Sequence, residues 1–148
     1  MRIEIDQSTK IEQSGPTILA FANGTTHAIL IPSRVKHSAF QALRAKGKSK
    51  EVAHLLLFAA CLYLLLDQHL HQLRKIVIDI EYPGKNVDIK AFLLRYIRRQ
   101  IPDFEADKIT FQLIGKKSPA DFKARRVREK RDKNYRKIGS KELIKLIA

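Results

Sequence analysis

The sequence predicts a mixed α/β domain with a five-stranded sheet. Three observations support this fold class. The first third of the chain contains three strand-like runs, a long apolar helix follows them, and helices and strands alternate after that helix. Consecutive antiparallel strands followed by such alternation predict a mixed sheet that carries helices. Because no repeat and no low-complexity linker is visible, we expect one domain over residues 1–148.

The three N-terminal strands are predicted by their residue pattern. Residues 2–7 alternate apolar and polar side chains, with Ile3 and Ile5 on one face and Glu4 and Asp6 on the other. Residues 16–22 and 26–32 are rich in strand-forming side chains and flank an Asn-Gly pair, which is a strong hairpin signal. We therefore expect three antiparallel strands in sequence order.

A long helix is predicted over 49–73, after a basic connector with a short helix over 38–45. Ser49 is a plausible N-cap, and Glu51 in the first turn complements the helix dipole. Residues 55–66, the centre of the apolar helix 52–66, are apolar on every side, which predicts burial on every side. This burial is expected between the sheet and other helices, or in a homodimer interface. The apolar stretch is too short to cross a bilayer, which takes about 20 residues.

The second half of the chain alternates between the two element types. Residues 75–82 form a second alternating strand that carries Asp79, and Asn86 is placed to cap a helix over 87–100. Residues 108–115 predict the fifth strand. Residues 122–137 are strongly basic and are expected to be helical, and an amphipathic tail follows.

The charge of the chain predicts a polyanionic partner. The 29 Lys and Arg outnumber the 15 Asp and Glu, which gives a net charge of +14. Such an excess favours nucleic acid, RNA, DNA or a hybrid, as the partner, with no membrane. One cysteine excludes an internal disulfide, and no secretory leader is recognisable, so we expect a cytoplasmic protein.

The sequence lacks the common catalytic and nucleotide-binding motifs. It has no G-x-S-x-G, no G-x-x-x-x-G-K-[ST] and no G-x-G-x-x-G. Acids remain at the ends of separate elements, and four carboxylates of this kind could hold two Mg²⁺ or Mn²⁺ ions. Taken singly, each acid also has a local explanation in a turn or helix start, except Asp79 in its strand. The candidate metal-ligating and catalytic residues are Asp6, Glu51, Asp79 and Asp121.

The order of elements and these acids resemble the ribonuclease H-like superfamily of metal-dependent nucleases, resolvases and integrases. Asp6-Gln7-Ser8 is similar to the Asp-Gly-Ser with which ribonuclease H begins its site. The resemblance implies a sheet with the first and fourth strands as parallel neighbours, each carrying an aspartate. It implies that the four acids are metal ligands. Glu4 and Glu81 lie on the same predicted strand faces as Asp6 and Asp79 and are the alternative ligands if the register differs.

Two functions follow as expectations. The first is a nuclease that hydrolyses phosphodiester bonds with two metal ions. The second is a non-catalytic basic nucleic-acid-binding protein, RNA- or ribosome-associated, on a mixed α/β fold. In the first case, basic side chains near the last acid would hold the nucleic-acid backbone, namely Lys116, Lys117, Lys123, Arg125, Arg126 and Arg128.

Overall fold

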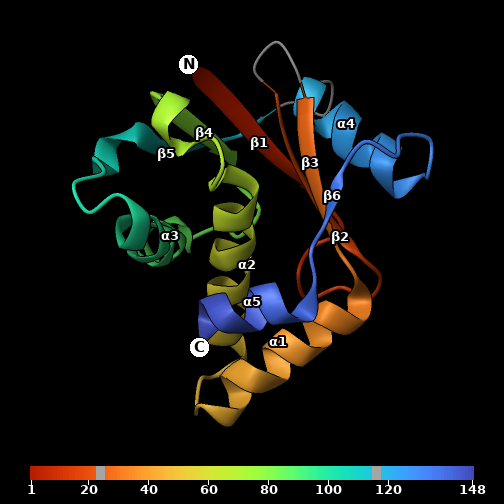
Figure 1. Cartoon of the computed structure of the whole chain (residues 1–148), viewed down its shortest axis with the longest axis vertical. Helices are drawn as coiled ribbons and strands as arrows, with labels where there is room; N and C mark the ends of the chain where they lie inside the picture. Colours follow the sequence, from red (N-terminus) through yellow and green to blue (C-terminus); the bar gives the residue numbers. More distant parts are fainter. Residues whose placement is uncertain (23–25, 115–117) are drawn as a thin grey trace.

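The computed structural model describes residues 1–22, 26–114 and 118–148 of the chain. These residues form a mixed α/β fold with a six-stranded sheet and five α-helices (Figure 1). The strands are β1 (Arg2–Ser8), β2 (Thr17–Ala22), β3 (Thr26–Ile31), β4 (Lys75–Asp79), β5 (Ile109–Gln112) and β6 (Arg136–Lys137). The helices are α1 (Ser33–Ala45), α2 (Lys50–Leu66), α3 (Asn86–Gln100), α4 (Pro119–Arg128) and α5 (Ser140–Ile147), with short 3₁₀ turns η1 (Leu70–Gln72) and η2 (Ala106–Lys108).

The strand order in the sheet is β5-β4-β1-β2-β3-β6. β1, β2 and β3 are antiparallel neighbours, as the sequence predicts. β4 lies parallel to β1 on its other side, and β5 lies parallel to β4. β1 and β4 are therefore the inner parallel pair, and the chain reaches β4 through the two helices α1 and α2.

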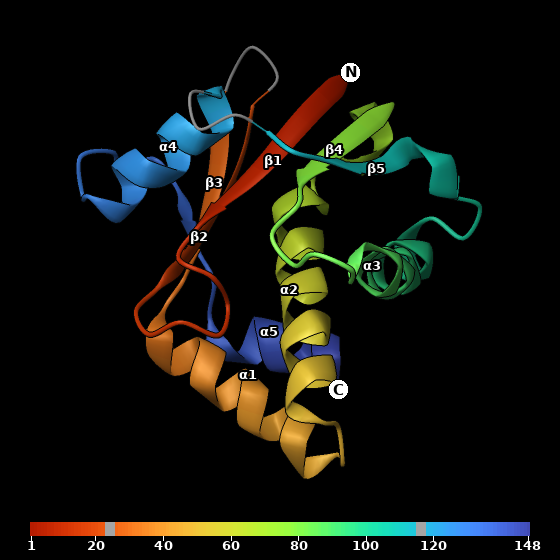
Figure 2. The same ribbon diagram turned by 180° about the vertical axis from the view of Figure 1, so that it is seen from behind.

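Helix α2 crosses one face of the sheet and is the centre of the main core (Figures 1 and 2). Its N-terminus is capped as predicted, because Ser49 Oγ accepts a hydrogen bond from the Val52 amide at 3.2 Å. Helices α1, α3 and α5 pack around it and the sheet lies behind it. The chain itself thus covers the helix, and its apolar character needs no second copy. In the described part of the chain, no helix is long and apolar enough to cross a membrane.

Helix α4 lies against the opposite face of the sheet (Figure 2). Its small side chains Ala124 and Val127 pack on Ile18, Ala20 and Ala28 of β2 and β3. The residues of β2 that lie between these in the sequence, such as Leu19, point to the other face and belong to the core around α2. The side of the sheet on which a strand residue lies therefore decides whether it faces α2 or α4.

The basic C-terminal segment differs from its prediction. We expected one helix over 122–137, but α4 ends at Arg128 and a sixth strand follows at Arg136–Lys137, parallel to β3. Lys130 has a φ of 61° just after the helix, so the chain turns there. The buried Lys123 Nζ holds the returning chain through Asp132 Oδ2 at 2.7 Å and the Asn134 carbonyl at 2.8 Å.

Several predicted boundaries also change. The long helix ends at Leu66 rather than residue 73, and η1 occupies much of the remainder. The connector helix begins at Ser33, five residues before the predicted start. Asn86 lies inside α3 and is not its cap, because Lys85 holds the N-cap position. The predicted Asn-Gly turn lies outside the described residues.

Shortening a fully buried side chain in α2 is expected to destabilise the whole fold. Leu62 is completely buried in the core that joins the helix to the sheet. Leu62→Ala should lower the free energy of unfolding by about 2–5 kcal/mol, because it removes buried contacts and leaves a cavity. Chemical denaturation measures this loss. Val87→Ala in α3, where the side chain is exposed, should change it by less than about 0.5 kcal/mol.

Candidate metal centre

Two aspartates meet where the inner parallel strands end. The β1–β4 register pairs Ile5 with Ile78, so the next residues, Asp6 and Asp79, lie side by side. Asp6 is paired across the sheet with Ala20, which packs against α4, so its side chain is on the α4 face. The predicted pairing of these two strand carboxylates is thus seen in the structure.

A third carboxylate completes the cluster. Glu81 follows Asp79 by two residues, and one carboxylate oxygen from each of Asp6, Asp79 and Glu81 lies within 4.8 Å of the others. Among the described residues this is the one group of three or more potential metal-ligating side chains that lie so close together. Asp6 is buried, and the other two are half-buried.

Backbone hydrogen bonds fix the orientation of both aspartates. Asp6 Oδ1 accepts a hydrogen bond from the Gln7 amide at 2.8 Å. Asp79 Oδ1 accepts one from the Ile114 amide at 2.7 Å, which ties it to the chain after β5. Two residues beyond Asp6 on the same strand face, Ser8 Oγ is buried and has no hydrogen-bond partner among the described residues. The α4 face of β1 therefore carries an unsatisfied hydroxyl as well as the carboxylate of Asp6.

Asp121 lies near the cluster but is not a member of it. It lies in the first turn of α4, whose N-cap Ser118 accepts a hydrogen bond from the Asp121 amide at 3.1 Å. Its carboxylate lies 3.9 Å from the Arg125 guanidinium. Its negative charge also helps to raise the pKa of Asp6. The predicted fourth acid is thus close enough to influence the site electrostatically.

Two other predicted or alternative acids lie apart. Glu51 is exposed and forms an ion pair with Lys85, and it is not in the close cluster. It lines a cavity of about 390 Å³ together with Glu81, but neither Asp6 nor Asp79 lines that cavity. Glu4 forms an ion pair with Arg2 at 3.0 Å and is also outside the cluster.

The cluster favours bound protons or a bound cation. Burial is the largest cause that raises the pKa of Asp6, and the negative charges of Asp79 and Asp121 raise it further. The pKa reaches about 6 even though the hydrogen bonds of Asp6 lower it. Burial is also the largest cause that raises the pKa of Glu81. Hydrogen bonds with both aspartates and repulsion from them raise it further, to about 8. Three ionised carboxylates this close repel one another, and a hard divalent cation would relieve the repulsion.

The basic residues expected at the site divide into three groups. Arg125 and Arg128 are exposed on α4, and Arg126 stacks its guanidinium over Phe122. Lys123 is only 4% exposed and is paired with Asp132. Its ammonium group is therefore not on the surface where we expected it to hold the nucleic-acid backbone. Lys116 and Lys117 lie outside the described residues.

Sequence reasoning treated Glu81 only as an alternative ligand. The Ile-Asp-Ile-Glu pattern places Asp79 and Glu81 on one face of an extended segment, so the sequence did carry this signal. The sequence could not show that Glu51 pairs with Lys85, because that lysine follows β4 and meets α2 only in the folded chain.

Comparisons with known proteins leave the site to be interpreted from its own geometry. No family model matches the chain, and the searches of curated proteins and of solved structures also gave no match.

The metal-free protein is expected to lose stability as the pH rises. The folded-state pKa of both Asp6 and Glu81 is raised, so the native state binds more protons than the unfolded chain between roughly pH 4.5 and 8. The free energy of unfolding therefore falls across this range. Thermal unfolding in EDTA at several pH values measures the effect.

Two controls sharpen this measurement. Asp79→Asn removes one of the repelling charges and should flatten the pH dependence, whereas Asp107→Asn, an exposed acid in η2, should leave it unchanged.

Added Mg²⁺ should raise the melting temperature more at pH 8 than at pH 5, because the carboxylates must be ionised to bind it. A melting temperature that Mg²⁺ does not change at any pH would contradict the assignment of a metal site.

Proposed function

We propose that this protein is a metal-dependent nuclease that hydrolyses phosphodiester bonds of nucleic acid. The observation that carries the proposal is the gathering of Asp6, Asp79 and Glu81 in a chain of net charge +14. Carboxylates gathered in this way are unfavourable when ionised unless a cation is bound. The excess of Lys and Arg elsewhere suits a polyanionic substrate.

The strand order supports a ribonuclease H-like assignment of the fold. Three antiparallel strands come first, and β4 and β5 then add parallel to β1 in the order β5-β4-β1-β2-β3. This arrangement agrees with what the resemblance in the sequence implies for the inner parallel pair. The sixth strand, β6, extends the sheet beyond that five-stranded pattern.

The donor set suits Mg²⁺ or Mn²⁺. All three side chains of the cluster offer hard carboxylate oxygens, which these ions prefer. Asp6, Asp79 and Glu81 would hold the metal, with Asp121 bordering it. When bound, two such ions would activate a water molecule and neutralise charge on the leaving oxygen.

The protein's own groups would orient this site and the substrate. The Gln7 and Ile114 amides hold the two aspartates in place, so the ligands are positioned before metal binds. Exposed Arg125 and Arg128 extend along α4 beside Asp121, where they would contact phosphates. Asp121 would therefore lie between the acidic cluster and these arginines.

A non-catalytic nucleic-acid-binding protein is the second candidate function. It is favoured by the net charge, which by itself requires no chemistry. Under this alternative the protein would bind nucleic acid without cleaving it in the presence of Mg²⁺ or Mn²⁺. The two candidates therefore separate in one cleavage assay.

Loss of either strand aspartate is expected to abolish cleavage. The wild-type protein should cleave at least one of RNA/DNA hybrid, branched DNA or single strands with Mg²⁺ or Mn²⁺, and EDTA should stop the reaction. Asp6→Asn and Asp79→Asn should each lower the rate by about 100-fold or more, since a metal ligand matters at least as much as its outer-shell partners. Asp107→Asn is the matched control and should keep the wild-type rate. Cleavage that survives Asp79→Asn would show that the site is wrongly assigned.

Removal of an exposed α4 arginine is expected to weaken binding without changing sequence preference. Arg125→Ala and Arg128→Ala should each reduce the slope of log K against log salt by about 1, because each removes one phosphate contact. Fluorescence anisotropy over a salt series measures the slope. Lys48→Ala, an exposed cation in the α1–α2 loop, should leave the slope unchanged. Equal slopes for all variants would place the nucleic acid elsewhere on the protein.

A further inference from the structure

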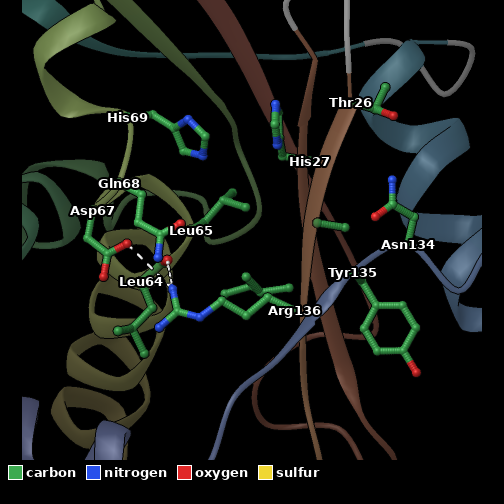
Figure 3. Close-up of a pocket in the computed structure, with 12 residues that line it drawn as sticks. Thr26, His27, Leu64, Leu65, Asp67, Gln68, His69, Asn134, Tyr135 and Arg136 are labelled. Atoms are coloured by element: carbon green, nitrogen blue, oxygen red, sulfur yellow. Dashed lines mark hydrogen bonds and ion pairs between the residues drawn. The ribbon is translucent and has the colours of Figure 1, made fainter.

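A second cavity lies between the end of α2 and the outer strands β3 and β6 (Figure 3). Its volume is about 530 Å³, which is within the range of small-molecule sites. His27 of β3 faces this space, and its cross-strand partner Phe21 belongs to the α2 core. The cavity is therefore on the α2 side of the sheet, whereas the Asp6 side chain is on the α4 side.

The cavity has apolar walls and an aromatic end. Leu64 and Leu65 of α2 and Ile29 of β3 are buried and form the walls. At the other end, the rings of His27 and His69 have their centroids 4.7 Å apart, and both pack against Phe21 at 4.8 and 5.1 Å. These π surfaces and aliphatic walls suit a flat ligand of low polarity on its faces.

The charges in the lining are balanced. Arg136 crosses the cavity, where it donates to the Leu64 carbonyl at 3.2 Å and lies 3.5 Å from Asp67 Oδ1. It also forms an ion pair with Glu142. Burial is the largest cause that lowers the pKa of His27, and repulsion from His69 and Lys123 lowers it further. The lowered pKa favours an uncharged ring at neutral pH. An anion would thus compete with two carboxylates for the one guanidinium, so a neutral ligand is favoured.

The remaining polar side chains can form hydrogen bonds with the edge of such a ligand. Gln68, at the end of α2, and Asn134, just before β6, line the cavity and are largely exposed. A carboxamide offers a donor and an acceptor side by side, which is the pattern that Gln and Asn use to bind adenine through two hydrogen bonds. The lining thus combines edge recognition with aromatic and apolar walls.

We propose that the cavity between α2, β3 and β6 binds a single nucleobase, with adenine as the best match. The base could come from a free nucleoside or from an unpaired position in a nucleic-acid strand, because both present the same ring. The proposal does not depend on the metal centre. It holds for a nuclease and for a non-catalytic binding protein alike.

Calorimetric titration of the full chain tests the proposal. The probes are adenosine, a single-stranded oligo(dA), the matching oligo(dA)–oligo(dT) duplex, and ribose 5-phosphate, which lacks a base. Adenosine or the single strand should bind, and ribose 5-phosphate should not. Binding of the nucleoside points to a free ligand. Binding of the single strand points to an unpaired base in a polymer only if the duplex binds more weakly and the cavity variants lose the difference, because the basic residues could hold the backbone of either polymer.

Matched variants locate the binding. Gln68→Ala removes an exposed carboxamide from the cavity and should weaken adenine binding by about 10-fold, since one bidentate pair is worth about that factor or more. His69→Ala should weaken it similarly through lost stacking. Gln72→Ala and His71→Ala, exposed neighbours that do not line the cavity, are the controls and should bind like wild type.

Three outcomes would overturn the proposal. The first is no binding of either adenosine or the single strand. The second is equal binding of ribose 5-phosphate, which would indicate an anion site. The third is equal losses in the cavity variants and in their controls. Asp79→Asn separates the two proposals, because it should abolish cleavage and leave base binding intact.

Discussion

The parallel pairing of β1 with β4 is the constraint on which the candidate metal centre depends. It pairs Ile5 with Ile78 and so brings Asp6 beside Asp79 at the centre of the sheet. A shift of one residue in this register would turn one aspartate towards α2, where it would be buried among leucines. The isoleucines that alternate with the acids prevent the shift, because they belong to the α2 core.

The core supports a cluster that opposes folding. Burial and mutual repulsion raise the pKa of Asp6 and Glu81, so ionising them costs stability. Helix α2, buried on all sides by the sheet and by α1, α3 and α5, supplies the apolar contacts that offset this cost. Such a conflict between local electrostatics and packing is typical of functional sites rather than of structural ones.

The basic C-terminal segment has two roles that its sequence alone does not separate. Lys123 is buried and uses its charge on Asp132, so that the chain returns to the sheet as β6. Arg125 and Arg128 are exposed on α4, the helix whose first turn carries Asp121. The return of the chain also places Arg136 against the end of α2, where it lines the second cavity. The contacts of Lys123 with Asp132 and Asn134 thus hold the segment that leads to β6 and Arg136.

The sequence by itself determined most of the elements and two of the three clustered acids. Alternation in β1 and β4, the hairpin strands and the all-apolar helix follow local rules, and Asp79 within a strand was unusual enough to be identified. Lys123 could have been recognised as buried, because it lies beside Ala120, Ala124 and Val127 on the apolar side of α4.

Only the tertiary structure decided which acids meet. Glu81 joins Asp6 and Asp79 while Glu51 pairs with Lys85, and the contacts responsible join residues tens of positions apart. The second cavity likewise needs α2, β3 and β6 together. Such contacts depend on strand order and helix packing, and a local residue pattern carries no information about the distance between distant segments.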